Sequence, residues 1–209
     1  MLYLKSFNFP SEAVEYNFIL DEKRTCFDTF YPFKILSKND FERIDFEPVT
    51  ILYGGNGSGK STALNAIAEK VEVLRDSIFN KSNFFGEYVS MSEFEIENEI
   101  SSMSRIITSD DVFDYILNVR NLNEGIDYKR EDLFTEYQDA KYSDFKMNSL
   151  DDYEELKKVN SARSKTMSKY VRNNLMDNVR LYSNGESAYR YFIEKITENG
   201  LYILDEPEN

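Results

Sequence analysis

Hydrophobic and polar residues alternate in three short stretches within the first fifty positions. These stretches are LYLKSFNF (2–9), FYPFKIL (30–36) and ERIDFEPV (42–49), and polar turns separate them. A repeat of two residues is typical of β-strands, because successive side chains of a strand point to opposite faces. The pattern therefore predicts small antiparallel strands that form a β lobe over residues 1–48.

An uninterrupted apolar run, VTILYG (49–54), follows this lobe and leads into a glycine-rich turn. Its length and composition favour a buried parallel strand. Beyond the glycines, apolar side chains recur at the spacing of one helix face, at Leu64, Ile67, Ala68, Val71 and Leu74. The pattern predicts a strand, a glycine loop and a helix over residues 49–82.

The region 83–181 is mostly polar. Within it, SEFEIENEI (92–100) places glutamates at alternate positions, which predicts a half-exposed strand. Residues 110–180 have a mainly helical pattern, with breaks expected near 121–127 and 142–152. We interpret 83–181 as an acidic, largely helical insertion.

The last segment, 182–209, predicts one more helix and one more strand. SNGESAYRYFIEKITENG (183–200) opens like a capped helix, and LYILDEPEN (201–209) is an apolar strand that ends in carboxylates. The whole pattern indicates a single α/β domain with a mostly parallel central sheet. Because a strand this near Asn209 leaves a sheet incomplete, we expect the C-terminal part of the fold to be missing, and the chain in isolation to have weak stability and impaired turnover.

Composition and charge exclude some classes of protein and change the picture of the insertion. The single cysteine, Cys26, cannot form an internal disulfide, and no apolar run reaches the roughly 20 residues that span a bilayer. We therefore expect a cytoplasmic protein without direct membrane insertion. Residues 92–157 contain 18 Asp and Glu against 7 Lys and Arg, which offers a surface for a protein partner.

The sign of the charge reverses over residues 158–181. The basic residues there are Lys158, Arg163, Lys165, Lys169, Arg172 and Arg180, against Asp177 alone. Since nucleic-acid binding needs dispersed positive charge, and the formal net charge is -13, this stretch is first interpreted as a solvated helix face. Nucleic-acid binding is the weaker alternative.

An exact match to the pattern GxxxxGK[ST] lies in the glycine loop, between the predicted strand and helix. Its residues are Gly54, Gly55, Asn56, Gly57, Ser58, Gly59, Lys60 and Ser61, and Thr62 follows. Glycines let backbone N–H groups approach phosphate oxygens closely, and the next helix N-terminus adds a favourable field. Lys60 would reach the β- and γ-phosphates, and the Ser61 hydroxyl would coordinate Mg²⁺. The alternative, a glycine turn without a ligand, rarely keeps all the specified positions.

Two adjacent carboxylates, Asp205 and Glu206, end the last apolar strand. Ligands of open α/β sheets bind at this carboxyl edge of the strands. We expect Asp205 to bind Mg²⁺ through water, since Mg²⁺ keeps much of its hydration shell, and Glu206 to polarise the attacking water. Strands that end in Asp-Glu are common, so this interpretation depends on its pairing with Lys60.

A third candidate element, SNGES, begins at Ser183, 22 residues before Asp205. Ser183 and Glu186 have the S-x-x-E spacing of a capping box, which begins many ordinary helices. A glycine-containing helix start of this kind, with Ser183 at its cap and Gly185 within it, can also donate hydrogen bonds to a γ-phosphate. Both interpretations stay open.

In their order and spacing, the loop from Gly54 to Thr62, the SNGES segment and LYILDEPEN resemble the Walker A, signature and Walker B motifs of ATP-binding-cassette (ABC) ATPases. The resemblance implies ATP and Mg²⁺ as ligands, ATP hydrolysis, and a homodimer that forms head to tail through the nucleotide. It also implies that Ser183 and Gly185 of one copy contact the γ-phosphate held by the other. GGNGSGKST and SNGES are closer to soluble AAA-family ATPases allied to RecF, Rad50 and SMC proteins than to transporter subunits.

The resemblance is poor over residues 83–180. Its family has a glutamine between two lobes, whereas the only glutamine here is Gln138, in a polar segment. Ser109, Asp110 and Asp111 are candidates for that loop, with a simple strand-end turn as the alternative. The sequence has no histidine, so the switch histidine of the family cannot be assigned. Two rival functions are an ATP-binding transporter subunit and a non-catalytic ATP-dependent interaction module.

Overall fold

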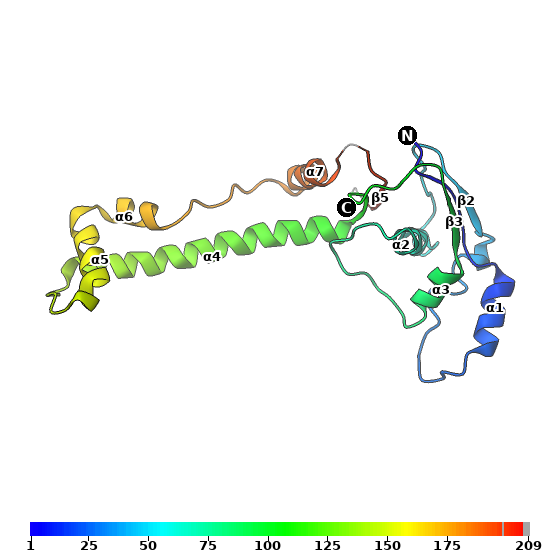
Figure 1. The fold of residues 1–209 in the computed structure, drawn as a ribbon, viewed down its shortest axis with the longest axis horizontal. Coiled ribbons are helices and arrows are strands. Elements are labelled where there is room, and N and C mark those ends of the chain that lie inside the picture. Colours follow the sequence, from blue (N-terminus) through cyan, green and yellow to red (C-terminus); the bar gives the residue numbers. More distant parts are fainter. Residues whose placement is uncertain (198, 207–209) are drawn as a thin grey trace. The chain divides into compact units, whose positions relative to one another are not determined.

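The computed structural model describes residues 1–197 and 199–206 of the chain (Figure 1). Its internal contacts divide the chain into two compact units. Unit 1 comprises Met1–Phe113 and Ala188–Asn209, and unit 2 comprises Asp114–Ser187. Each unit has a hydrophobic cluster of its own.

Unit 1 contains a three-stranded antiparallel sheet with the order β2-β1-β3. Strand β1 (Leu4–Asn8) lies in the centre, between β2 (Arg43–Asp45) and β3 (Glu93–Ile96). The strands predicted within 2–9, 42–49 and 92–100 are therefore confirmed. All four residues of β3 are exposed, so this edge strand is more open to solvent than a half-buried pattern suggests.

The strand predicted at 30–36 is wrong. Turns occupy this segment, which lies between helix α1 (Glu12–Asp21) and a short 3-10 helix, η1 (Ser37–Asn39). Lys34 has a left-handed backbone with a φ of 62°, which lies outside the β region of a regular strand. Phe33 and Leu36 are 5% and 1% exposed, so the apolar residues of the segment serve core packing instead of strand pairing.

The buried strand predicted at 49–54 is also wrong. Val49, Ile51 and Tyr53 are 80%, 82% and 100% exposed, and the segment pairs with no strand among the described residues. The Thr50 hydroxyl instead accepts a hydrogen bond from the N–H of Glu47 and donates one to its carbonyl oxygen. Such local bonds from a threonine compete with strand pairing.

Parallel pairing occurs between β4 (Arg105–Thr108) and β5 (Tyr202–Asp205), which form a two-stranded sheet. The predicted mostly parallel sheet is therefore reduced, in the described residues, to this pair and one bridge from Leu74 to Arg105. The helix predicted through Leu74 is shorter in the structure. Helix α2 (Lys60–Lys70) ends before Leu74, and this residue pairs with Arg105 instead.

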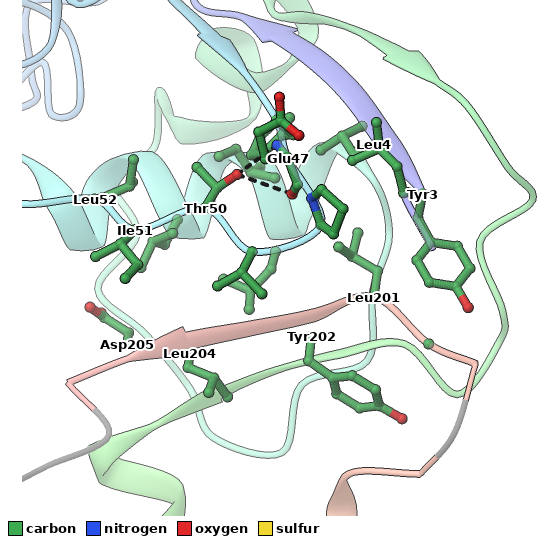
Figure 2. Close-up of a pocket in the computed structure, with 18 of the residues that line it drawn as sticks. Tyr3, Leu4, Glu47, Thr50, Ile51, Leu52, Leu201, Tyr202, Leu204 and Asp205 are labelled. Atoms are coloured by element: carbon green, nitrogen blue, oxygen red, sulfur yellow. Dashed lines mark hydrogen bonds between the residues drawn. The ribbon is translucent and has the colours of Figure 1, made fainter.

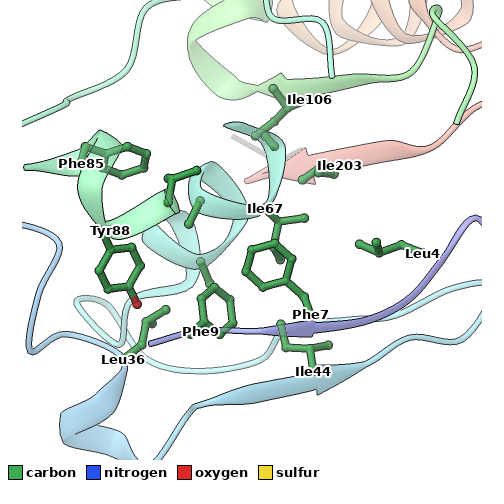
Figure 3. Packing of buried hydrophobic residues seen from close by; sticks show 14 of the residues in the cluster. Leu4, Phe7, Phe9, Leu36, Ile44, Ile67, Phe85, Tyr88, Ile106 and Ile203 are labelled. Carbon is green, nitrogen blue, oxygen red and sulfur yellow. The ribbon is translucent and has the colours of Figure 1, made fainter. Parts of the chain in front are cut away.

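The core of unit 1 packs both sheets against helix α2 and helix α3 (Phe85–Met91). Figure 3 shows Phe7 of β1 and Ile44 of β2 beside Ile67 of α2, with Ile203 of β5 close by. Burial of apolar side chains at such a junction contributes about 1.5–3 kcal/mol for each one fully removed from water. The core thereby fixes the start of α2 relative to the end of β5.

Unit 2 is helical. It contains most of α4 (Ser109–Tyr142), then η2 (Leu150–Asp152), α5 (Tyr153–Ser164), α6 (Met167–Asn174) and the first residues of α7 (Asn184–Lys195). These bounds confirm the mainly helical prediction and the break near 142–152.

The break predicted at 121–127 is wrong, because α4 continues through it. Ile126 is 5% exposed, and the buried Asn123 side chain binds the backbone of Val179. These contacts outweigh the low helix propensity of Gly125.

Candidate functional site

The glycine loop leads directly into α2, as the sequence predicts. Gly57 and Gly59 have φ values of 77° and 92°, a left-handed region that favours glycine. Gly59 caps the helix, and a Cβ at this position would lie 2.7 Å from Leu36 Cδ2. The loop therefore places backbone N–H groups at the start of a helix, the arrangement that binds phosphate in many proteins.

Lys60 lies over this loop. Its ammonium group donates to the carbonyl oxygens of Gly54 at 2.8 Å and Gly55 at 3.0 Å. The residues from Gly55 to Ser58 are exposed, so solvent reaches the loop. A phosphate would offer this ammonium charged oxygens, which form stronger hydrogen bonds than neutral carbonyls.

Ser61 and Asp205 are 144 positions apart in the sequence and meet in the structure. The Ser61 hydroxyl donates to Asp205 Oδ1 at 3.2 Å, from the first turn of α2 to the end of β5. Octahedral Mg²⁺ holds its oxygens at 2.0–2.1 Å, which places neighbouring oxygens about 3 Å apart. The pair therefore fits the edge of a magnesium coordination shell that phosphate oxygens and water would complete.

The electrostatics of Asp205 also suit a cation. Burial raises the pKa of this carboxyl group above its ordinary value of 3.8, and the neighbouring charge of Glu206 raises it further. The hydrogen bond from Ser61 and the positive charges of Lys60 and Arg75 lower it. A divalent cation would relieve the cost of burying this charge. Glu206 follows the strand, is exposed, and has a left-handed φ of 49°.

Sequence reasoning missed two supports of this site. The hydroxyl groups of Tyr31 and Thr62 form a hydrogen bond at 3.2 Å. Arg75 binds the side chain of Asn65 and lies over the ring of Phe79, at 4.1 Å from its centroid. Nothing in the sequence indicates these pairings, because each joins residues that no local repeat relates.

The other candidate residues have structural contacts that leave their function a prediction. The Ser183 hydroxyl accepts a hydrogen bond from the N–H of Glu186, so Ser183 caps α7 as the ordinary interpretation requires. Ser183 and Gly185 belong to unit 2. Asp111, one of the candidates for the glutamine loop, is 4% exposed and accepts from the N–H and the hydroxyl of Thr108.

A cavity of about 650 Å³ adjoins the loop (Figure 2). Its walls come from residues 1–4, 46–52 and 200–206, together with Lys60, Leu64 and Ile67. Figure 2 shows Ile51 and Leu52 across the cavity from Leu204 and Asp205. The polar residues Lys60 and Asp205 thus line a space whose other walls are largely apolar.

Within the ranges 1–197 and 199–206, no three His, Cys, Asp or Glu residues gather into a metal-binding group. The oxygens of Ser61 and Asp205 would hold a magnesium ion together with the phosphates of a nucleotide. In the same ranges no helix is both long and apolar enough to cross a bilayer.

Comparison with known proteins identifies the family. A model of the family described as ABC transporter matches residues 43–209, which include the glycine loop, SNGES and the Asp205 strand. Pro207, Glu208 and Asn209, at the end of this match, lie outside the described residues. No curated protein and no solved structure matches the chain. ABC domains bind and hydrolyse ATP, generally with Mg²⁺, and typically dimerise. With its family model matched over most of its length, this chain belongs to the ABC family of P-loop ATPases.

Proposed function

We propose that the chain is an ATP-hydrolysing switch in which ATP drives two copies to pair head to tail and hydrolysis releases them. One observation carries the proposal furthest, namely the contact of Ser61 with Asp205 at 3.2 Å beside the loop that ends in Lys60. ATP hydrolysis requires that the phosphates and Mg²⁺ are bound before the chemical step, and the loop and this oxygen pair are suited to bind them.

In this proposal each residue has a separate task. The backbone from Gly54 to Thr62 and the Lys60 ammonium bind the β- and γ-phosphates, while Ser61 and Asp205 hold Mg²⁺. Glu206 polarises the attacking water, a contribution of about 10²–10⁴-fold to the rate in general-base catalysis. Its exposed position directly after β5 supports this task, because the water must reach it.

The pairing of two copies rests on the start of α7. Ser183 caps this helix, and apart from the adjoining residues and the backbone of α7 itself, no heavy atom of the described residues lies within 4 Å of where a Cβ of Gly185 would be. An open helix start of this kind supports the proposal that Ser183 and Gly185 contact the γ-phosphate bound by a second copy.

Replacement of Lys60 by alanine tests the nucleotide-binding part. We expect Lys60→Ala to lower ATP affinity by at least about 100-fold, since charged hydrogen bonds to phosphate are each worth roughly 1.5–3 kcal/mol. Titration with a fluorescent ATP analogue and Mg²⁺ measures this change, with Lys23→Ala as an exposed control. Equal affinity in the wild type and Lys60→Ala would contradict the proposal.

Replacement of Glu206 by glutamine tests the switch. Because Gln cannot accept a proton from water, Glu206→Gln should bind ATP but hydrolyse it at least about 100-fold more slowly, which accumulates the ATP-bound dimer. Analytical ultracentrifugation with ATP measures the dimer, and the exposed Glu93→Gln is the matched control. A variant that stays monomeric with ATP, while the wild type hydrolyses ATP, would rule out the dimer.

We propose one ATPase domain over 1–209, with 83–181 as an insertion, and a closer relationship to soluble RecF-like and SMC-like ATPases on the basis of the GGNGSGKST and SNGES motifs. Co-purification with a membrane-spanning protein would instead favour a transporter subunit. Full biological function in Glu206→Gln would favour a non-catalytic interaction module that uses the acidic segment 92–157.

A further inference from the structure

Glu15 on helix α1 is a fully buried carboxylate, at 0% exposure, and such side chains are rarely buried without partners. Its Oε2 accepts hydrogen bonds from the N–H of Lys34 at 2.7 Å and from the hydroxyl of Ser37 at 2.6 Å. Both donors belong to residues 31–37, which we name the bracing segment. Glu15 thus joins α1 to a segment that contains no strand and no α-helix.

The bracing segment needs this tie, because its backbone is unusual. Lys34 has a φ of 62°, a left-handed conformation that residues with side chains adopt infrequently. The N–H of this same residue is the one that Glu15 binds. Loss of the carboxylate would leave that N–H without its partner and remove a constraint on the conformation of Lys34.

The bracing segment also contacts the phosphate-binding loop at two points. The Leu36 and Ile35 side chains lie so close to Gly59 that a Cβ there would meet them at 2.7 and 2.9 Å. The Tyr31 hydroxyl binds the Thr62 hydroxyl at 3.2 Å. Gly59 caps α2 and Thr62 lies in its first turn, where the N–H groups that would face a phosphate are located.

We propose that Glu15 is a positioning residue for nucleotide binding. Through Lys34 and Ser37 it holds the bracing segment against Gly59 and Thr62, and so keeps the phosphate-binding loop in the shape that receives a triphosphate. The inference rests on the proposed function of that loop. A buried charge is a poor way to gain stability alone, since an apolar side chain of similar size usually does as well or better. Unlike an apolar side chain, the Glu15 carboxylate accepts two hydrogen bonds from the bracing segment.

The test measures ATP–Mg²⁺ affinity of the purified chain by titration with a fluorescent ATP analogue. Glu15→Ala should weaken binding about tenfold, which corresponds to about 1.4 kcal/mol. Glu15→Gln keeps an oxygen acceptor for Lys34 and Ser37, so its affinity should stay within about twofold of the wild type. Glu12→Ala, an exposed glutamate on the same helix, is the matched control and should not change the affinity.

A double-mutant cycle distinguishes this role from general loss of structure. If Glu15 acts through the bracing segment, the losses of affinity in Glu15→Ala and Leu36→Ala should not add, because each one releases the same contact with Gly59. Circular dichroism confirms that each variant is folded at the temperature of the titration. Should Glu15→Ala not fold, Ser37→Ala replaces it in the cycle and should weaken binding about two- to threefold.

The outcomes separate this inference from the proposed function. Wild-type protein that binds no ATP–Mg²⁺ would contradict the proposed function, and this inference with it. Wild-type protein that binds ATP, together with a folded Glu15→Ala of equal affinity, would overturn the inference alone. Additive losses in the cycle, or a Glu15→Gln affinity as low as that of Glu15→Ala, would also overturn it.

Discussion

Around the glycine loop, the neighbours of two carboxyl groups determine what each group can bind. Glu15 and Asp205 are both carboxyl groups whose pKa burial raises, yet they have different neighbours. Glu15 is bound by the N–H of Lys34 and the hydroxyl of Ser37, whereas Asp205 faces Ser61. The first arrangement holds a segment of backbone, and the second fits a cation.

The raised pKa of Glu15 predicts a pH-dependent stability. Burial raises it above 4.5 in the folded state, against the hydrogen bonds from Ser37 and Lys34, with Glu12 and Tyr88 as further titratable neighbours. Its contribution to stability is therefore full below pH 4.5 and is lost as the pH rises through the folded-state pKa. Glu15→Gln lacks this loss, so its melting temperature should rise relative to the wild type between pH 4 and 8. Parallel pH curves for the two proteins would contradict this.

At the scale of elements, the sequence predicts those parts whose cause is local. The start of α2 follows from Gly59 and Lys60, and β5 follows from a short apolar run. The strand predicted at 49–54 fails because a strand requires a neighbour, and no property of the run itself shows that Ile51 will be exposed. The continuous course of α4 through Gly125 likewise depends on a contact with residues far along the chain.

That contact of α4 predicts a local change of stability. The Asn123 side chain donates to the carbonyl oxygen of Val179 and accepts from its N–H, both at 2.7 Å. Asn123→Ala removes both bonds, which should speed hydrogen–deuterium exchange of the Val179 N–H by at least about tenfold, because this N–H loses the hydrogen bond that protects it from exchange. The exposed Asn121→Ala on the same helix is the control. Unchanged exchange at Val179 in Asn123→Ala would show that α4 does not hold this segment.

At the scale of the whole molecule, the candidate site is more predictable than the fold around it. The roles proposed for Lys60, Ser61 and Asp205 follow from the glycine loop and from the strand that ends in carboxylates, and the family match over 43–209 includes both. The bracing contacts of Glu15 and Tyr31 could not be predicted, because they join segments that no motif relates. Motifs thus indicate the groups that we propose to bind a ligand, whereas the residues that support those groups are found only in the structure.

The most direct measurement of the central claim is the Mg²⁺ dependence of ATP affinity in the wild type, Ser61→Ala, Asp205→Ala and the double variant. If Ser61 and Asp205 hold one Mg²⁺ beside the loop, removal of Mg²⁺ with EDTA should weaken wild-type binding at least about tenfold. Each single variant should then lose most of this dependence, and the double variant should lose no more than the singles. Wild-type affinity that does not change with EDTA, or additive losses in variants that keep their Mg²⁺ dependence, would contradict the account.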